Sequence, residues 1–286
     1  MQKHKIIEPA ENELPSHYAD RLGVDYTATV TLGHKKSSGQ FFTPTGIAKL
    51  MASFAAPSSG KIRILDPGCG TAVLSSALIE WLVNSGNKFD SIELTAYETD
   101  LNLKPFAEAA LNYLRKWLGK RNVDFQFILD SEDFVLSNAD KLIDSSLFST
   151  EPEDRFDYVV SNPPYFKLPK EDMRVKVTKG IVSGQTNIYS LFMAMSAKML
   201  NANGQLIFIV PRSFTSGSYF KEFRKFFFKL IKPEQIHLFV SRKDAFSRDN
   251  VLQETMIIKG SMRGKQKAGD VIVSSSHGLS DIDNLK

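Results

Sequence analysis

The segment that decides the fold is Asp66-Pro67-Gly68-Cys69-Gly70-Thr71, in which two glycines lie one residue apart. A short apolar stretch, residues 61–66 (KIRILD), precedes it, and residues 71–83 follow with a helical apolar pattern. Glycine lets a backbone approach a ligand closely, and the first turn of a helix offers N–H groups without helical partners. The segment therefore predicts a strand–turn–helix unit that can bind a ligand.

Strand and helix patterns alternate along the rest of the chain. Helices are expected over residues 43–55, 71–83, 101–118, 187–200 and 219–231, and strands over residues 61–66, 92–98, 125–130, 156–161, 204–210, 235–240 and 254–259. Such alternation is typical of βαβ units and a parallel sheet. No long helix separates the last two strands, so they are expected to pair antiparallel. The pattern predicts an α/β, Rossmann-like fold with a seven-stranded, mostly parallel sheet and helices on both faces.

The composition is that of an ordinary globular protein. Of 286 residues, 42% are hydrophobic and 24% charged, which excludes a disordered chain. No apolar run approaches the ~20 residues that span a bilayer, so no membrane association is expected. The single cysteine, Cys69, excludes a disulfide framework and fits a cytoplasmic protein. The five histidines lack metal-ligand spacing, so no metal site is expected, and a net charge of +4 is compatible with nucleic acid.

The residues around the glycine turn favour one class of cofactor. A dinucleotide fingerprint requires a third glycine, and Val73 stands in its place. Asp66 precedes the turn, and a carboxylate there disfavours a pyrophosphate but suits a sulfonium with an amino-acid tail. Glu98 ends the second strand, where an acid can bind a ribose diol. These features together indicate S-adenosylmethionine, although each acid alone could also serve as a helix cap.

A second motif, Asn162-Pro163-Pro164-Tyr165, follows the fourth expected strand. Proline has no N–H group, so consecutive prolines stiffen the backbone and leave carbonyl acceptors, to which Asn162 adds a side-chain oxygen. Tyr165 contributes a flat aromatic face. Acceptors that converge beside an aromatic ring suit the exocyclic amino group of a planar base, whereas the alternative interpretation is a rigid turn.

With the glycine turn, this motif resembles class I S-adenosylmethionine-dependent methyltransferases that act on planar amide or amino nitrogens. Residues 39–44 (GQFFTP) resemble the cofactor-closing motif of N6-adenine DNA methyltransferases from bacterial restriction–modification systems. Residues 185–192 and 203–211 resemble the same family, and the motifs follow its order from about residue 39 to 260. The resemblance implies an adenine-specific, site-specific DNA methyltransferase with double-stranded DNA as its partner.

The resemblance also implies a domain organisation. Residues 39–260 are expected to form the catalytic domain, after an irregular or helical extension at residues 1–38. Residues 261–286 are expected to be a polar tail, because the family's target-recognition domain is absent or truncated. Sequence recognition would then come from that missing domain or from a separate specificity subunit.

The family pattern assigns roles by position at the cofactor. The residues it assigns there are Phe42, Thr43, Asp66, Gly68, Gly70, Glu98, Asp133 and Phe134. The first two are expected to close over the methionine part, the turn to line its amino-acid end, and Glu98 to bind the ribose. Asp133 is expected to contact the amino group of the cofactor's adenine, with Asp130 at the strand end as a rival acid. Phe134 is expected to pack on the adenine ring.

The same pattern assigns the catalytic residues. The Asn162 side-chain oxygen and the Pro163 carbonyl are expected to accept hydrogen bonds from the two N–H groups of the target amino group. Pro164 is expected to stiffen the backbone there. Tyr165 and Phe192 are expected to sandwich an adenine that has flipped out of the duplex. The alternative for Phe192 is core packing.

Two other function classes remain open from the sequence. A methyltransferase of RNA adenine or of a release-factor glutamine shares the NPPY motif but does not usually carry the GQFFTP segment. A non-catalytic fragment or subunit that needs a partner is the other. The basic face of residues 219–231 fits either a solvated helix or a contact with DNA phosphates.

Overall fold

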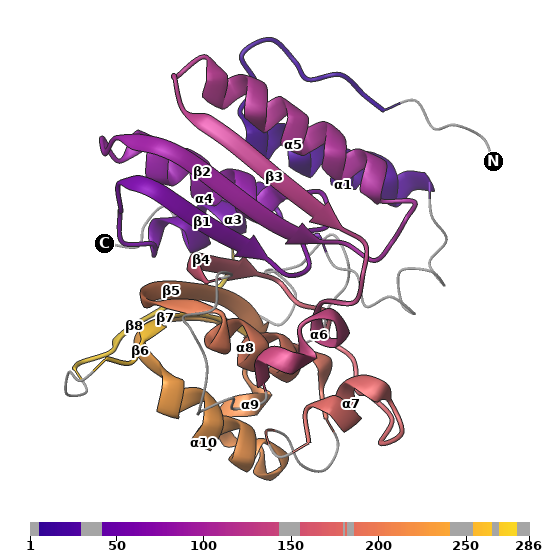
Figure 1. Cartoon of the computed structure of the whole chain (residues 1–286), viewed down its shortest axis with the longest axis vertical. Coiled ribbons are helices and arrows are strands. Elements are labelled where there is room, and N and C mark those ends of the chain that lie inside the picture. The colour runs from indigo at the N-terminus through magenta and orange to yellow at the C-terminus, as the bar shows by residue number, and fades with distance from the viewer. Residues whose placement is uncertain are drawn as a thin grey trace.

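A single twisted sheet forms the centre of the chain (Figure 1). The computed structural model describes residues 6–29, 42–142, 155–179, 181, 186–240, 254–264 and 269–278. Its strands are β1 (Gly60–Asp66), β2 (Phe89–Tyr97), β3 (Asp124–Asp130), β4 (Phe156–Ser161), β5 (Leu200–Pro211), β6 (Ile231–Phe239), β7 (Thr255–Met262) and β8 (Ile272–Ser276). They lie in the order β3-β2-β1-β4-β5-β7-β6-β8.

The strand directions confirm the expected mostly parallel sheet. Strands β1 to β5 pair in parallel with their neighbours, and β8 pairs in parallel with β6. Among the described strands, only β7 runs antiparallel, between β5 and β6. The parallel strands therefore bring their carboxyl ends to one edge, where ligands bind in such sheets.

Helices cover both faces of the sheet. The helices are α1 (Pro15–Thr29), α3 (Thr45–Ser53), α4 (Val73–Asn84), α5 (Lys104–Gly119), α6 (Phe134–Ser137), α7 (Met173–Val177), α8 (Ile188–Lys198), α9 (Ser213–Ser216) and α10 (Lys221–Leu230). Two 3₁₀ turns, η1 (Ala139–Leu142) and η2 (Ser218–Phe220), complete the elements. Side chains of α1, α3, α4 and α5 share one apolar core with the sheet, and those of α6, α8 and α10 share the other.

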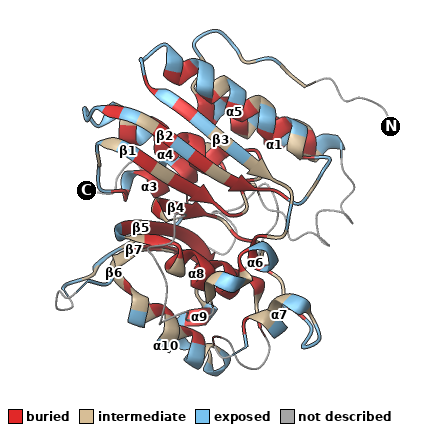
Figure 2. Cartoon of the chain, viewed as in Figure 1, coloured by how far each residue is buried: buried red, intermediate tan, exposed pale blue. Residues whose placement is uncertain are grey.

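The central strands β1, β4 and β5 are mostly buried on both sides because helices cover both faces of the sheet, whereas the edge strand β3 is partly exposed (Figure 2). Successive residues of a strand point to opposite faces. Ile64 belongs to the core under α4, whereas the next residue, Leu65, belongs to the core under α8. Val160 and Val159 alternate in the same way on β4. This two-sided burial explains why the strands appear in the sequence as continuous apolar runs.

The sheet has eight strands, so the expected count of seven was one too low. The additional strand, β8, lies within the expected polar tail and pairs with β6. His237 of β6 lies within hydrogen-bond distance of the hydroxyl groups of Ser274 and Ser276. Ile272 and Val273 are mostly exposed at this sheet edge. Because β8 contains several serines and lies at an exposed edge of the sheet, its sequence lacks the buried apolar pattern that predicts a strand.

The amino-terminal helix α1, which lies in the predicted irregular or helical extension, is part of the core. Tyr18, Leu22 and Tyr26 recur every four residues on α1 and are buried against the domain. Glu80 of α4 accepts hydrogen bonds from the Ser16 backbone N–H and hydroxyl, at 2.6 and 2.8 Å. These contacts join the start of α1 to α4. None of the described helices is long and apolar enough to cross a bilayer.

Candidate active site

A cavity of about 420 Å³ opens at the carboxyl ends of β1, β2 and β4. Most of the side chains expected at the site line it. Those on its wall are Phe42, Gly68, Gly70, Glu98, Asp133, Phe134, Asn162, Pro164 and Phe192. Those absent from its wall are Thr43, Asp66, Pro163 and Tyr165. The parallel sheet thus gathers motifs that are far apart in the sequence around one space.

The glycine turn forms the floor between two aromatic rings. Gly70 has a φ of 57°, a left-handed conformation that glycine adopts without strain. A Cβ atom on Gly70 would lie 3.4 Å from the Phe42 ring, and one on Gly68 would lie 3.5 Å from the Phe192 ring. The Cys69 N–H donates to the Tyr97 carbonyl at 2.9 Å, which ties the turn to the end of β2. The turn therefore exposes backbone, not side chains, to a ligand.

Glu98 is an acid on the wall that is almost fully buried. Its carboxylate accepts hydrogen bonds from the backbone N–H groups of Gly70 (3.2 Å) and Asp100 (2.8 Å). Burial, aided by the nearby Asp100 and Asp66 carboxylates, raises the pKa of Glu98 to about 7. A hydroxyl or cationic ligand that pairs with the ionised form would relieve this cost.

Asp66 lies behind the turn and not on the cavity wall. It is fully buried, and its carboxylate accepts a hydrogen bond from the hydroxyl of Ser75 in α4. Burial raises the pKa of Asp66 to about 7. Asp66 therefore joins β1 to α4. The sequence had predicted instead that Asp66 lines the amino-acid end of the cofactor.

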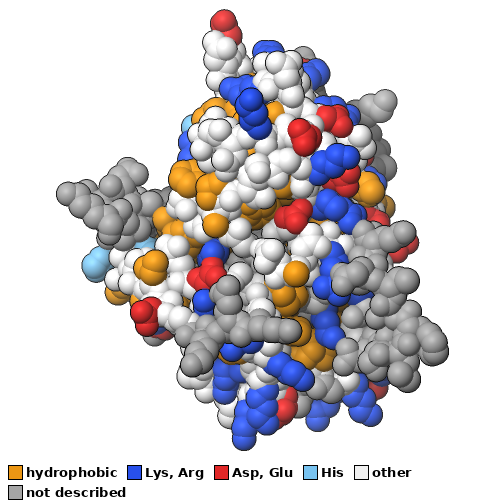
Figure 3. Space-filling view, turned by 60° about the vertical axis from the view of Figure 1, so that its left-hand side comes forward, with side chains coloured by type: hydrophobic (Ala, Val, Ile, Leu, Met, Phe, Trp, Pro, Cys, Tyr) orange, Lys and Arg blue, Asp and Glu red, His pale blue; other side chains and the backbone are white. Residues whose placement is uncertain are grey.

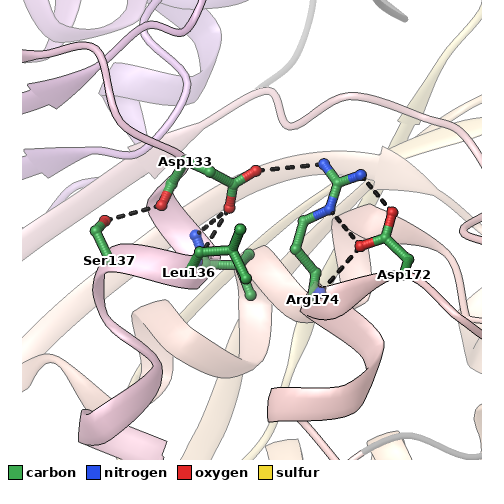
Figure 4. A network of polar contacts seen from close by, with 6 residues as sticks. Asp133, Leu136, Ser137, Asp172 and Arg174 are labelled. Carbon is green, nitrogen blue, oxygen red and sulfur yellow. Dashed lines mark hydrogen bonds and ion pairs between the residues drawn. The ribbon is translucent and has the colours of Figure 1, made fainter.

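Asp133 lies on the wall and is held on both of its oxygens (Figure 4). Oδ1 accepts from the backbone N–H groups of Val135 (2.9 Å) and Leu136 (3.0 Å), which caps α6. Oδ2 lies 3.3 Å from Arg174 Nη1 of α7, and the same guanidinium pairs with Asp172 at 2.7 Å. The rival acid Asp130 is absent from the wall.

Asn162 stands on the wall with two buried hydroxyl groups beside it. Its Nδ2 donates to Thr43 Oγ1 at 3.0 Å, and its Oδ1 accepts from the Tyr165 hydroxyl at 2.6 Å. The Tyr165 hydroxyl also lies 2.8 Å from the Ile209 carbonyl of β5. Thr43 thus contacts the NPPY motif, whereas the sequence analysis expected it at the methionine part of the cofactor.

The aromatic rings of the cavity differ from the expected pair. The Tyr165 ring packs edge-on to Tyr189, with centroids 6.3 Å apart, and does not line the cavity. The next residue, Phe166, does line it. The Phe192 ring reaches the wall from α8 and lies 5.2 Å from the Phe134 ring. Phe166 and Phe192 are therefore the aromatic wall residues of the NPPY segment and α8.

Three side chains at the site were not anticipated from the sequence. Tyr26 of α1 donates its hydroxyl to Asp100, and its ring packs edge-on to Phe42 with centroids 6.1 Å apart. The four-residue spacing of the apolar residues in α1 could have identified Tyr26 as buried. Arg174 had no local signal beyond its place in a basic segment. Asp100 lies two residues after Glu98 and could have been included with it.

The charge of the wall is mainly negative. Glu98, Asp100, Glu132 and Asp133 contribute four carboxylates, and Arg174 contributes one guanidinium. Such a wall suits hydroxyl groups, amino groups and cations better than phosphates. Within the described ranges, no group of three or more His, Cys, Asp or Glu side chains could hold a metal ion. The site therefore combines a mainly acidic wall with the amide of Asn162.

Comparisons with known proteins agree with this chemistry. The family model described as "Eco57I restriction-modification methylase" matches residues 76–246. The type II methyltransferase M.BsuBI of Bacillus subtilis is 32% identical over 82% of this chain and 45% of its own length. M.PstI of Providencia stuartii is 31% identical over 85% of this chain and 46% of its own length. The chain thus spans less than half the length of these two relatives.

The fold has a counterpart among solved structures. A Listeria monocytogenes protein, described as a class I S-adenosylmethionine-dependent methyltransferase, superposes with a TM-score of 0.68. The alignment covers 94% of this chain and 75% of the other, at 19% identity. That likeness concerns the fold alone.

Proposed function

Because this chain belongs to the Eco57I restriction-modification methylase family, we propose that it transfers a methyl group from S-adenosylmethionine to the N6 amino group of adenine in DNA. The adenine is flipped out of the duplex, because its amino group cannot otherwise reach a buried cavity. The observation that carries the proposal is the position of the Asn162 side chain. It shares one cavity with Glu98 and the glycine turn, so an amide acceptor faces a cofactor-sized space.

The cavity fits this cofactor in volume and in chemistry. A volume of about 420 Å³ lies in the ordinary range for small-molecule sites. The Glu98 carboxylate would bind the ribose hydroxyls, and Asp133 with Phe134 would hold the adenine. The backbone of Gly68 and Gly70 would lie along the amino-acid end, below Phe42. When bound, the cofactor supplies an electrophilic methyl group on its sulfonium.

The chain's own residues would activate the target nitrogen by orientation. The lone pair of an adenine amino nitrogen is delocalised into the ring, so it is a weak nucleophile. The Asn162 side-chain oxygen would accept a hydrogen bond from one N–H of the amino group and favour a tetrahedral nitrogen. The Pro163 carbonyl does not line the cavity, so it would have to turn toward the base to accept a hydrogen bond from the other N–H. The lone pair then points toward the cofactor side of the cavity. Catalysis of this kind depends on positioning and preorganised dipoles.

Aromatic side chains would hold the flipped base. Phe192 and Phe166 line the cavity and would stack on the base, and such stacking contributes about 1–3 kcal/mol per base. The Tyr165 ring would have to rotate away from Tyr189 to join them. We therefore assign the stacking surface to Phe192 and Phe166 in the first place.

Duplex DNA is the proposed partner, held mainly through its phosphates. The exposed Lys221, Lys225 and Lys229 of α10 share one helix face. Lys and Arg side chains gather at the lower end of the view in Figure 3, the end that carries α10 in Figure 1. Recognition of a specific site would come from a further domain or a separate specificity subunit. A protein with this substrate works in the cytoplasm.

The experiment is a transfer assay with methyl-labelled S-adenosylmethionine and duplex DNA, alongside RNA and protein substrates. We expect label on N6 of adenine in DNA. Asn162→Ala should lower the rate by about 10²–10³-fold, the usual loss for one preorganised polar contact. Cofactor affinity, measured by calorimetry, should stay within a few fold.

A matched control is Asn201→Ala, which removes another half-buried asparagine, one that donates to Asp157 at 2.6 Å and is absent from the cavity wall, and it should leave the rate unchanged. Label on RNA or on a protein amide would refute the DNA assignment. Wild-type turnover in Asn162→Ala would refute the amino-group mechanism.

A further inference from the structure

The Asn162 carboxamide is fixed from both ends by hydroxyl groups. Nδ2 donates to Thr43 Oγ1 at 3.0 Å, and Oδ1 accepts from the Tyr165 hydroxyl at 2.6 Å. Thr43 comes from the segment before α3 and Tyr165 from the NPPY motif itself. The two anchors thus reach the same side chain from segments more than a hundred residues apart in the chain.

Both anchors are buried, whereas Asn162 reaches the cavity. Thr43 is 5% exposed and Tyr165 is 8% exposed, and neither lines the wall. Burial raises the pKa of Tyr165 well above its usual value, so its hydroxyl keeps its single proton, which Asn162 Oδ1 at 2.6 Å shares with the Ile209 carbonyl at 2.8 Å. Neither hydroxyl is in a position to contact a ligand in the cavity. Their effect on a ligand must pass through Asn162.

The orientation of the carboxamide decides whether Asn162 can work. A carboxamide has an acceptor at one end and two donors at the other, and a half-turn of the side chain exchanges them. The target amino group offers only N–H donors toward Asn162. If the carboxamide were turned the other way, its NH₂ group would face these donors and no hydrogen bond could form. A hydroxyl at each end restricts this rotation and reduces the entropy lost on reaching the productive geometry.

We propose that the hydroxyl groups of Thr43 and Tyr165 are positioning groups that orient the Asn162 carboxamide toward the target amino group. This inference rests on the proposed function. It differs from the role that the sequence resemblance implies for Thr43, which is a contact with the methionine part of the cofactor. It also gives Tyr165 a role through its hydroxyl, in addition to any role of its ring.

The test compares variants that keep or remove one hydroxyl. Thr43→Val has nearly the shape of threonine without the hydroxyl, and Thr43→Ser keeps the hydroxyl. We expect Thr43→Val to lower kcat about tenfold, since small errors of position are costly in rate, and Thr43→Ser to recover most of it. Tyr165→Phe should lower kcat similarly. The dissociation constant of S-adenosylmethionine, measured by calorimetry, should change less than twofold in all three.

Thr45→Val is the matched control. Thr45 is the first residue of α3, two positions after Thr43, and its hydroxyl donates to Asp20 at 2.8 Å and not to Asn162. We expect it to leave kcat unchanged. A Thr43→Val variant with wild-type kcat, or one whose loss lies in cofactor affinity, would overturn the positioning role. Failure of Asn162→Ala to affect turnover would instead overturn the proposed function, so the two failures are distinguishable.

A second measurement is independent of turnover. In protein labelled with ¹⁵N on asparagine, the Asn162 side-chain amide signal is assigned by its loss in Asn162→Ala. We expect it to be shifted and protected from solvent exchange in the wild type and in Thr43→Ser. In Thr43→Val it should move toward the position of exposed asparagines and exchange faster. An unchanged signal in Thr43→Val would refute the anchoring.

Discussion

Cofactor binding should depend on pH through Glu98. Burial raises the pKa of this carboxylate from its ordinary 4.5 to about 7, and the ribose hydroxyls require its ionised form. At pH 5.5 only about 3% of such a group is ionised, against about three quarters at pH 7.5. The dissociation constant should therefore rise about 25-fold between pH 7.5 and pH 5.5 and be almost constant above pH 8.

Calorimetry with the demethylated cofactor in two buffers of different ionisation enthalpy would measure this linkage. Binding at pH 6.5 should release about three quarters of a proton, because Glu98 must ionise. Adenosine keeps the ribose but lacks the amino-acid tail, and its dissociation constant should change with pH by the same factor.

Glu98→Gln is the decisive variant. It should bind more weakly at pH 7.5, since the glutamine side chain has only one oxygen for the Gly70 and Asp100 N–H groups, and its affinity should hardly change with pH. An affinity that varies less than threefold over this range in the wild type would refute the reasoning. If the dissociation constant of Glu98→Gln still changed with pH as much as that of the wild type, the titrating group would be another one. The buried Asp66 is then the first candidate.

Four further outcomes are expected. The ligand-free protein should lose stability as the pH rises from 5 to 8, because the raised folded-state pKa values of Glu98 and Asp66 contribute stability that is present at low pH and lost through about pH 7. Glu98→Gln should remove only part of the fall in melting temperature over that range, since Asp66 keeps its own share. Gly260→Ala should destabilise the fold by about 1–3 kcal/mol in denaturant unfolding, since its Cβ would lie 2.6 Å from Ile231 Cγ2, and unchanged stability would contradict this packing. Tyr26→Phe should remove the hydrogen bond to Asp100, cost about 1 kcal/mol of stability and weaken cofactor binding a few fold; equal affinity would mean that α1 does not support the cavity wall. Binding of this chain to random duplex DNA should be weak and fall steeply with salt in a filter or anisotropy assay, whereas tight, salt-insensitive binding to one short sequence would contradict phosphate-dominated contacts.

The location of the site was accessible from the sequence by itself. The glycine turn follows one apolar strand, Glu98 ends the next, and Asn162 follows a third. Parallel strands bring their carboxyl ends to one edge, so local patterns were enough to predict that these side chains meet. The antiparallel pairing of β7 with β6 was also predicted, because the sequence between them carries no pattern of a long helix.

The contacts that orient the site were decided only by the tertiary structure. Thr43 and Asn162 are 119 positions apart, and Arg174 and Asp133 are 41 apart, so no local pattern could pair them. Tyr165 is recognisable as an aromatic residue from the sequence, but packing alone determines that its hydroxyl contacts Asn162 while its ring packs against Tyr189. Periodicity reports which residues are buried or exposed, whereas the partner of a polar group depends on how whole elements pack.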